Sequence, residues 1–502
     1  MMQQVEVKNI HCLWITLLLV VLSFTYLKIT TFDFTYDDQL TIVENPLVND
    51  GVISIERTIE IFSSPYRPGT LYRPVTTLSY LLNCSVTGLN SGLFHLVNLL
   101  LHFLVGLLAY CLLTKFIDRS ISIIFGIGIW FIHPLNAEVL GGVVGRAEIL
   151  TALFALSSTC LFIKSLSKKS SVYELIATLL FCLSVLSKES GSIFIVITPL
   201  LVLVLSRSPQ VALRYFIFLA LGLLVCIALR YAALGADLLV RYPPDIKVAA
   251  NPLINTDLID RILPSLQLLG KYLIIAIFPV SLSADYSLSP LMFQELFLSF
   301  PYLILALVPL LLGLLCLRTG TVCISLFTLG VIALLPVLNL LTPIGTLMGE
   351  RLLYLPAIGF ILSVVLVFER FISKKYQYLC LVPVVVTLGT LTFTRLDVWR
   401  DNETLFSATV KDAPLSPKAH LNFALNRYEK GKTDDAKDHA LKAEELFPGN
   451  PDVARLLFKI ALDQEEIQQA LYWGTLAITR APEDAALQAI FQHLLAISNG
   501  KI

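Results

Sequence analysis

Ionisable residues gather in a few short motifs of this sequence, and the first motif is an acidic pair. Asp37 and Asp38 follow Tyr36 shortly after the first apolar run. Neighbouring like charges push one pKa upward, which suits a carboxylate that accepts or orients the proton of a hydroxyl. Adjacent aspartates can also be ordinary solvated loop residues. Because further acids and bases lie on the same predicted face, we predict that Asp37 and Asp38 are catalytic.

Later motifs place cations beside carboxylates. The residues predicted to bind the substrate or its phosphate are Arg73, His133, Glu138, Arg146, Glu148, Lys188, Glu189, Glu350 and Arg351. A phosphate-carrying lipid donor needs this chemistry, because cations hold the phosphate while a carboxylate activates the acceptor. For each cation alone, the alternative is a side chain that snorkels at the membrane interface.

Other kinds of chemistry have little support in the sequence. His133 is expected to form hydrogen bonds at a helix end, since no second His or Cys has the spacing of a metal ligand, and no metal site is predicted. A glycine-rich phosphate loop, G-x-S-x-G and H-E-x-x-H are all missing. Nucleotide-driven chemistry is therefore not expected, and neither is a cofactor. A divalent metal held by the clustered acids stays open.

Composition assigns these motifs to a membrane protein. Hydrophobic residues make up 56% of the 502 residues, charged residues only 15%, and the mean hydropathy is +0.77. Soluble domains carry about 25% charged residues, so most of this chain must be solvated by lipid. The 37 basic residues balance the 37 acidic ones, which gives no electrostatic basis for binding nucleic acid.

Apolar runs that recur along the chain predict the membrane helices. A crossing needs about 20 apolar residues. The runs are 13–30, 93–114, 120–136, 147–165, 173–187, 190–206, 213–233, 262–281, 300–317, 320–341, 352–372 and 377–394. The first run lacks a small-residue cleavage site and is interpreted as a retained signal anchor.

Basic residues in the short loops set the predicted orientation. With the N-terminus in the cytoplasm, one set of basic residues falls inside: Lys115, Arg119, Lys164, Lys168, Lys169, Arg207 and Arg214. The pattern continues only if 262–281 does not cross. Pro264, Gly270 and Lys271 support that choice, so about 259–285 is predicted to be interfacial or re-entrant. About eleven crossings and an external C-terminus follow.

The chain is predicted to contain two domains. Residues 1–398 form the membrane domain, with the external loop 31–92. Residues 399–502 are charged and alanine-rich, and Ala436, Ala443 and Pro448 recur about 34 residues later, as in tetratricopeptide repeats. Repeats are predicted at about 417–450 and 451–484, with a cap at 485–500. Such a solenoid can bind an extended acceptor polypeptide.

Several motifs in one order resemble a known family. They are Tyr36-Asp37-Asp38 with Glu44-Asn45-Pro46, Tyr72-Arg73-Pro74, Phe94-His95-Leu96-Val97-Asn98, His133-Pro134 with Glu138, Gly142-Val143-Val144-Gly145-Arg146-Ala147-Glu148, Leu186-Ser187-Lys188-Glu189, Met348-Gly349-Glu350-Arg351-Leu352-Leu353-Tyr354-Leu355-Pro356 and Trp399-Arg400-Asp401-Asn402-Glu403. Together they resemble the transmembrane and tetratricopeptide-repeat O-mannosyltransferases over nearly the whole chain.

The resemblance implies an all-α fold, a polytopic helical bundle of the C-type glycosyltransferase kind with a C-terminal repeat solenoid. It implies transfer of mannose from dolichyl-phosphate or another polyprenyl-phosphate carrier to Ser or Thr of proteins, with inversion, on the lumenal or periplasmic side. The acidic pair taken as catalytic in that family corresponds to Asp37 and Asp38. Because only about two repeats are expected, a short bacterial relative in an inner membrane, with a periplasmic site, is favoured over an endoplasmic reticulum protein.

Three other functions compete with this one. The same donor sugar can go to a lipid or a glycan, the chain can be a non-enzymatic membrane scaffold, or it can be a transporter. The transporter is disfavoured because transport sites lie midway through the helices. Two tripeptides on the predicted outer face, Asn83-Cys84-Ser85 and Asn402-Glu403-Thr404, also match the acceptor pattern for N-glycosylation.

Overall fold

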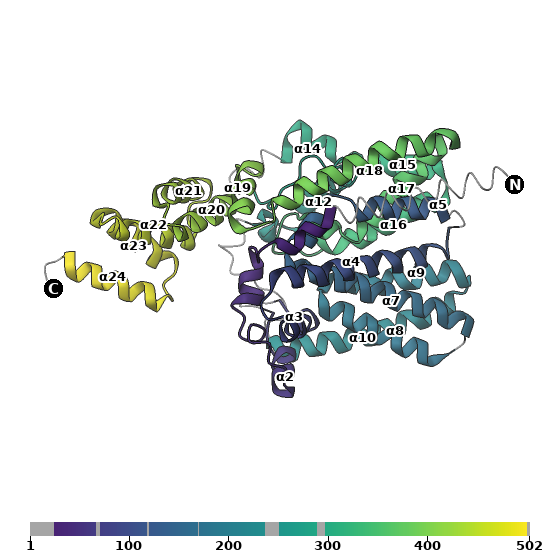
Figure 1. The fold of residues 1–502 in the computed structure, drawn as a ribbon, viewed down its shortest axis with the longest axis horizontal. Helices are drawn as coiled ribbons and strands as arrows, with labels where there is room; N and C mark the ends of the chain where they lie inside the picture. Colours follow the sequence, from purple (N-terminus) through teal and green to yellow (C-terminus); the bar gives the residue numbers. More distant parts are fainter. Residues whose placement is uncertain are drawn as a thin grey trace.

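The structure is a computed structural model that describes residues 25–66, 71–117, 120–168, 170–235, 250–288 and 297–498. These residues form helices and connecting segments, with no strand among them. Most of the first predicted crossing, 13–30, and so the predicted signal anchor, lies outside the described residues. Figure 1 shows a bundle of long helices from which an arm of shorter helices extends to the C-terminus.

The bundle contains most of the predicted apolar runs as helices. Its helices are α4 (Ser91–Leu113), α5 (Ser120–Phe131), α7 (Arg146–Lys168), α8 (Ser171–Ser187), α9 (Phe194–Ser206), α10 (Pro209–Leu234), α12 (Leu258–Ile277), α14 (Phe300–Leu305), α15 (Val308–Thr319), α16 (Thr321–Leu334), α17 (Pro356–Phe371) and α18 (Lys374–Asp397). Within the described ranges, five helical stretches are long and apolar enough to cross a membrane: Ser91–Leu113, Val143–Lys168, Glu189–Ser206, Pro209–Leu234 and Phe300–Thr319. The total of about eleven crossings stays a prediction.

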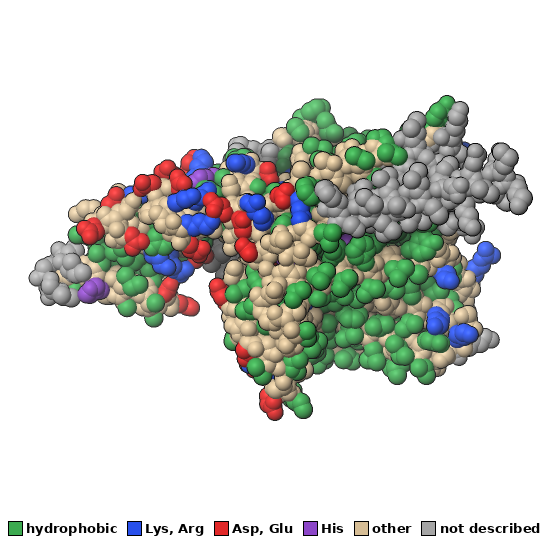
Figure 2. Space-filling view, viewed as in Figure 1, with side chains coloured by type: hydrophobic (Ala, Val, Ile, Leu, Met, Phe, Trp, Pro, Cys, Tyr) green, Lys and Arg blue, Asp and Glu red, His purple; other side chains and the backbone are tan. Residues whose placement is uncertain are grey.

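The surface of the bundle fits a lipid environment. Leu221, Leu224 and Val225 on α10 are each more than half exposed, and Figure 2 shows apolar side chains spread along the bundle. In the same view, Lys and Arg side chains gather at the end of the bundle opposite the arm. Water would not solvate such a surface well, so the described part of the chain has the character of a membrane protein.

Helix α12 includes the residues that suggested an interfacial element. Pro264 and Gly270 both lie inside this continuous helix and do not break it. A Cβ on Gly270 would lie 1.9 Å from the carbonyl oxygen of Leu305, so the glycine lets α12 pack closely against α14. α12 is not among the five stretches named above, and its interfacial position stays a prediction.

Short elements connect the long helices at the end of the bundle near the arm. They are η1 (Leu27–Thr31), η2 (Gln39–Val43), α2 (Ile55–Ser63), α3 (Pro74–Thr87), α6 (Asn136–Gly141), η3 (Val143–Gly145), η4 (Glu189–Ile193), η6 (Pro252–Asn255), η7 (Leu335–Val337) and η8 (Glu350–Leu353). α2 and α3 can be followed at this end in Figure 1. The motifs singled out in the sequence lie in or beside these connections.

The arm is built from α19 (Asn402–Asp412), α20 (Pro417–Glu429), α21 (Thr433–Leu446), α22 (Pro451–Asp463), α23 (Ile467–Arg480) and α24 (Ala485–Ser498). α20 packs on α21, and α22 packs on α23. Ala436, Ala443, Ala470 and Ala477 are fully buried where the helices meet, because small side chains let helices approach closely. The assignment of these pairs as tetratricopeptide repeats stays a prediction.

Candidate active site

Asp38 is fully buried and bonded to backbone. Its Oδ2 accepts hydrogen bonds from the amides of Thr35 (3.0 Å) and Val143 (3.1 Å), and its Oδ1 accepts one from Val144 (2.8 Å). Burial raises the pKa of Asp38 to about 7, although the three backbone donors act to lower it. Both oxygens are therefore occupied in holding the acidic turn against the segment that begins α7.

Asp37 lies beside Asp38 but is only partly buried. Its charge acts on Arg351 of η8 and on Lys418 of α20. Tyr36, just before it, has a φ of 51°, a left-handed conformation that costs a residue with a side chain roughly 1–2 kcal/mol. Of the two aspartates, Asp37 is the one that is partly exposed.

Glu138 and Arg351 form an ion pair in which the cation stays partly exposed, as a binding site for an anionic ligand requires. The Arg351 backbone N–H donates to Glu138 Oε2 (2.8 Å), and its guanidinium donates to Oε1 (2.6 Å). Glu138 is buried, but a third of the Arg351 side chain is exposed. Although burial opposes its charge, the carboxylates of Glu138, Asp37 and Glu148 raise the pKa of Arg351. Arg351 is thus a fixed cation with free surface beside Asp37.

Two further pairs lie near Arg351. Lys188 pairs with Glu148, and the Nε and Nη2 atoms of Arg73 lie 3.2 and 3.0 Å from Glu189 Oε2. Burial lowers the pKa of Lys188; Glu148 raises it, whereas Arg73 and Arg351 lower it further. The structure therefore brings the predicted cations Arg73, Lys188 and Arg351 within electrostatic reach of one another, each with a carboxylate partner.

Arg146 lies away from any open surface. It is fully buried between the rings of Tyr80 and Phe94. Its guanidinium donates to the side chains of Asn98 and Asn83, both at 2.7 Å, and to the carbonyls of Ser79 and Phe94. These bonds tie α3 and α4 to α7. Arg146 has the surroundings of a structural residue, and its predicted role in phosphate binding finds no geometric support.

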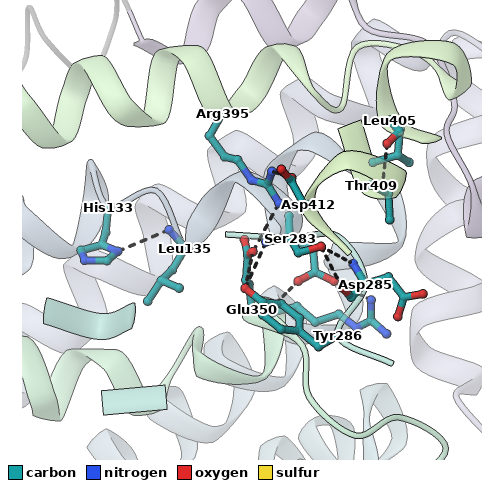
Figure 3. Close-up of polar contacts among 12 residues, drawn as sticks. His133, Leu135, Ser283, Asp285, Tyr286, Glu350, Arg395, Leu405, Thr409 and Asp412 are labelled. Atoms are coloured by element: carbon teal, nitrogen blue, oxygen red, sulfur yellow. Dashed lines mark hydrogen bonds and ion pairs between the residues drawn. The ribbon is translucent and has the colours of Figure 1, made fainter. Parts of the chain in front are cut away.

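His133 and Asn83 are also buried and hydrogen-bonded inside the protein. His133 is buried, and its Nδ1 accepts the N–H of Leu135 at 3.3 Å, as Figure 3 shows. Asn83, the acceptor of one predicted glycosylation tripeptide, is buried and bonds Arg146 and Thr87.

Glu350 belongs to a network that the sequence did not reveal. Its Oε1 accepts from Tyr286 Oη (2.9 Å) and from Arg395 Nη2 (3.3 Å), and Arg395 also contacts Asp412 (Figure 3). Burial raises the pKa of Glu350 to about 7, against the opposing effect of Arg395. The available signal was Arg395, a charge at the end of an otherwise apolar run.

Two cavities adjoin these groups. One of about 550 Å³ lies between α18, α19 and the turn after α12, and is lined by Arg395, Lys411 and Asp412 among others. A small one of about 30 Å³ lies between α7, α9 and η8, and both polar residues such as Glu148 and Ser190 and apolar side chains line it. Among the described residues, no group of three or more acids, histidines or cysteines could hold a metal ion.

Comparison with known proteins finds homologues of this chain. The Caenorhabditis elegans Protein O-mannosyl-transferase F38B6.6 is 28% identical over 441 residues, which cover 84% of this chain and 61% of the relative. Human Protein O-mannosyl-transferase TMTC1 is 27% identical over 497 residues, covering 86% and 55%, and human TMTC3 is 25% identical over 450 residues, covering 80% and 48%. The homologues of this chain are TMTC protein O-mannosyl-transferases.

The TMTC resemblance seen in the motifs is thereby confirmed. The chain spans about half to three fifths of the length of these TMTC relatives. No family model matches the chain, and no solved structure matches it. The bacterial origin predicted for it remains untested.

Proposed function

We propose that this chain is a membrane glycosyltransferase that moves mannose from a polyprenyl-phosphate or dolichyl-phosphate carrier to Ser or Thr hydroxyls of proteins. The observation that carries the proposal is the partly exposed Asp37, which lies within electrostatic reach of Arg351, as Lys188 and Arg73 do. The names of the homologues support the reaction class.

In the proposed reaction the acceptor hydroxyl attacks the sugar C1 and gives its proton to Asp37. The bond between C1 and the phosphate oxygen breaks, and the electron pair leaves with the polyprenyl phosphate. A single displacement of this kind inverts the anomeric centre. No nucleotide and no cofactor enter it, and Arg351 with Lys188 stabilises the charge that develops on the leaving phosphate.

Arg73, Lys188 and Arg351 are each paired with a glutamate when no donor is bound. An unpaired buried charge is costly, so Glu138, Glu148 and Glu189 hold the cations ionised and oriented. Arg351 uses its backbone N–H and Nη1 on Glu138. The third of its side chain that is exposed is available to a phosphate without breaking the pair.

The small cavity marks the place where the donor lipid is proposed to enter. Glu148 on its wall pairs with Lys188, and the apolar part of the wall includes Ile193, Phe194 and Val337. We propose that the first isoprene units lie there, between α7, α9 and the segment before η8, and that the remaining tail lies in the bilayer. At about 30 Å³ the cavity must widen when the lipid binds.

The proposed membrane arrangement follows the positive-inside rule. The basic end of the bundle in Figure 2 would face the cytoplasm, and the arm with the Asp37 site would face the lumen or periplasm. The acceptor polypeptide would approach from that side and bind the helical arm.

The test uses the purified full chain in nanodiscs with radiolabelled polyprenyl-phosphate mannose and a Ser/Thr-rich peptide. Label is expected on the peptide with the wild-type protein, and on a lipid acceptor only at background. Asp37→Asn is expected to abolish transfer, whereas Asp50→Asn, the same change at an exposed ion pair of the same loop, is expected to retain it. Activity is expected to persist in EDTA.

Three results would count against the proposal. Label on lipid but not on peptide would make the acceptor wrong. If the wild-type protein transfers none of several carrier-linked sugars, the transferase function is wrong and the non-enzymatic scaffold is favoured. Full activity of Asp37→Asn would remove the assigned base.

A further inference from the structure

The C-terminal arm touches the loop that holds the acidic pair. The backbone N–H of Asp33 donates to the Arg400 carbonyl at 2.9 Å. Three residues later, the backbone N–H of Tyr36 donates to Asn402 Oδ1 at 2.8 Å, across 366 positions of sequence. Asn402 is the first residue of α19, and the side chain of Asp401 caps that helix through Thr404. The Asn402 side chain that accepts this hydrogen bond is therefore held at the capped end of a helix.

The residue that donates this hydrogen bond, Tyr36, is the one with a strained backbone. Tyr36 has a φ of 51°, and such a backbone persists only when its surroundings enforce it. Here the surroundings come from the arm: Phe406 packs edge-on against the Tyr36 ring at 5.8 Å, and Lys418 Nζ lies 5.4 Å from the ring centre. Three side chains of α19 and α20 thus fix the conformation of the residue before Asp37.

Lys418 also faces acids of the membrane part. Although burial opposes its charge, Tyr36, Asp285 and Asp37 raise the pKa of Lys418. Asp285 in turn accepts from Ser416 Oγ at 2.9 Å, which holds the start of α20 against the segment after α12. The arm is therefore anchored at two places, the Tyr36 turn and the segment after α12.

We infer that the C-terminal arm completes the active site: Asn402 is a positioning residue that holds the Tyr36–Asp37 turn in its left-handed conformation, and Lys418 is the cation that the arm contributes at the Tyr36 ring. This inference rests on the proposed function. It gives the arm a role in the reaction itself, in addition to any binding of the acceptor. It also explains why a strained tyrosine directly precedes the proposed base.

The experiment compares Asn402→Ala with Asn402→Asp in the full chain, under the transfer assay described above. Asn402→Ala removes the acceptor and is expected to lower kcat by roughly 10- to 100-fold, because a displaced base loses alignment with the hydroxyl. The KM for the donor should change less than about twofold, since Arg351 and Lys188 are untouched. Asn402→Asp keeps an oxygen that can accept from Tyr36 and is expected to retain most of kcat.

The two variants also separate positioning from glycosylation. Both remove the Asn402-Glu403-Thr404 acceptor pattern, so activity retained by Asn402→Asp rules out a glycan as the cause. Glu429→Ala, at an exposed position on the neighbouring helix α20, is the control and is expected to behave like wild type. Hydrogen exchange at the Tyr36 amide should be slow in wild type and in Asn402→Asp but fast in Asn402→Ala, a readout that needs no activity.

The outcomes distinguish the inference from the proposed function. If Asn402→Ala keeps wild-type kcat while Asp37→Asn is inactive, the positioning role is overturned and the transferase stands. Equal losses in Asn402→Ala and Asn402→Asp would also overturn it. If exchange at the Tyr36 amide is unchanged in Asn402→Ala, the hydrogen bond does not hold the turn. An inert wild type would remove both proposals.

Discussion

Glu138 binds Arg351 twice, through the backbone N–H at 2.8 Å and through the guanidinium at 2.6 Å, across 213 positions of sequence. The backbone bond fixes the turn into η8, and the side-chain bond fixes the direction of the guanidinium. Glu138 also lies within electrostatic reach of Tyr272 and Glu350. One buried carboxylate therefore sets both the position and the charge of the cation that lies beside Asp37.

Arg351→Gln should weaken donor binding more than it weakens folding. The substitution removes the positive charge near the proposed phosphate but leaves the backbone bond to Glu138. We expect the KM for polyprenyl-phosphate mannose to rise about tenfold or more, as a lost charge-assisted hydrogen bond would cause. Initial rates over a range of donor concentrations measure this. An unchanged KM would remove Arg351 from the donor site.

Asp37→Asn and Asp38→Asn should fail for different reasons. Asp38→Asn places an amide N–H₂ against backbone donors of Thr35, Val143 or Val144. A cost of roughly 1–3 kcal/mol in the free energy of unfolding is expected. Asp37→Asn should lower the melting temperature less than Asp38→Asn does, while transfer is lost. Thermal unfolding beside the transfer assay checks both, and an Asp38→Asn protein as stable as wild type would contradict the bonding scheme.

Arg146→Lys should destabilise the membrane part without a specific effect on the donor. Lysine cannot reproduce the bonds of the guanidinium to Asn98, Asn83 and two carbonyls, so buried acceptors lose their partners. We expect a loss of roughly 2–4 kcal/mol and an unchanged donor KM for the protein that remains folded. A raised KM with unchanged stability would return Arg146 to the phosphate site.

Two buried carboxyls predict how stability depends on pH. Burial raises the pKa of Asp38 and of Glu350 to about 7, from ordinary values of 3.8 and 4.5. Between the pKa of the unfolded state and the pKa of the folded state, the folded protein binds more protons than the unfolded chain. The free energy of unfolding therefore falls as the pH rises up to about 7, by at most about 1.4 kcal/mol per pH unit for each group. The contribution is fully present only below the pKa of the unfolded state.

Glu350→Gln tests this pH dependence because it removes one titrating group. Oε2 of Glu350 has no hydrogen-bond partner in the described part of the chain, so an amide can take the place of the carboxyl without losing a bond there. The melting temperature of the variant, measured from about pH 5 to pH 8, should fall less steeply than that of wild type. Parallel curves would show that Glu350 keeps the same charge in both states.

The sequence by itself determined the membrane character, the position of most helices and the residues that could do the chemistry. These are local properties: apolar runs of sufficient length, and charges too costly to leave in lipid without a function. Lys188 and Arg351 could be predicted because each lies at the end of an apolar run, and Arg73 because it lies in the predicted external loop 31–92 on the same face. The family could be predicted because the order of the motifs survives where overall identity is low.

Only the tertiary structure decided which of these residues can act. Asp37 and Asp38 are equivalent in sequence, but the backbone conformation at Tyr36 turns Asp38 toward the amides of Val143 and Val144 and leaves Asp37 partly exposed. Hydropathy could not show that the guanidinium of Arg146 is hydrogen-bonded to amide and carbonyl oxygens inside the protein, since those partners come from two other helices. The contact between Asn402 and Tyr36 joins the first loop to the start of the C-terminal arm. Local sequence pattern carries no information on a contact between residues 366 positions apart.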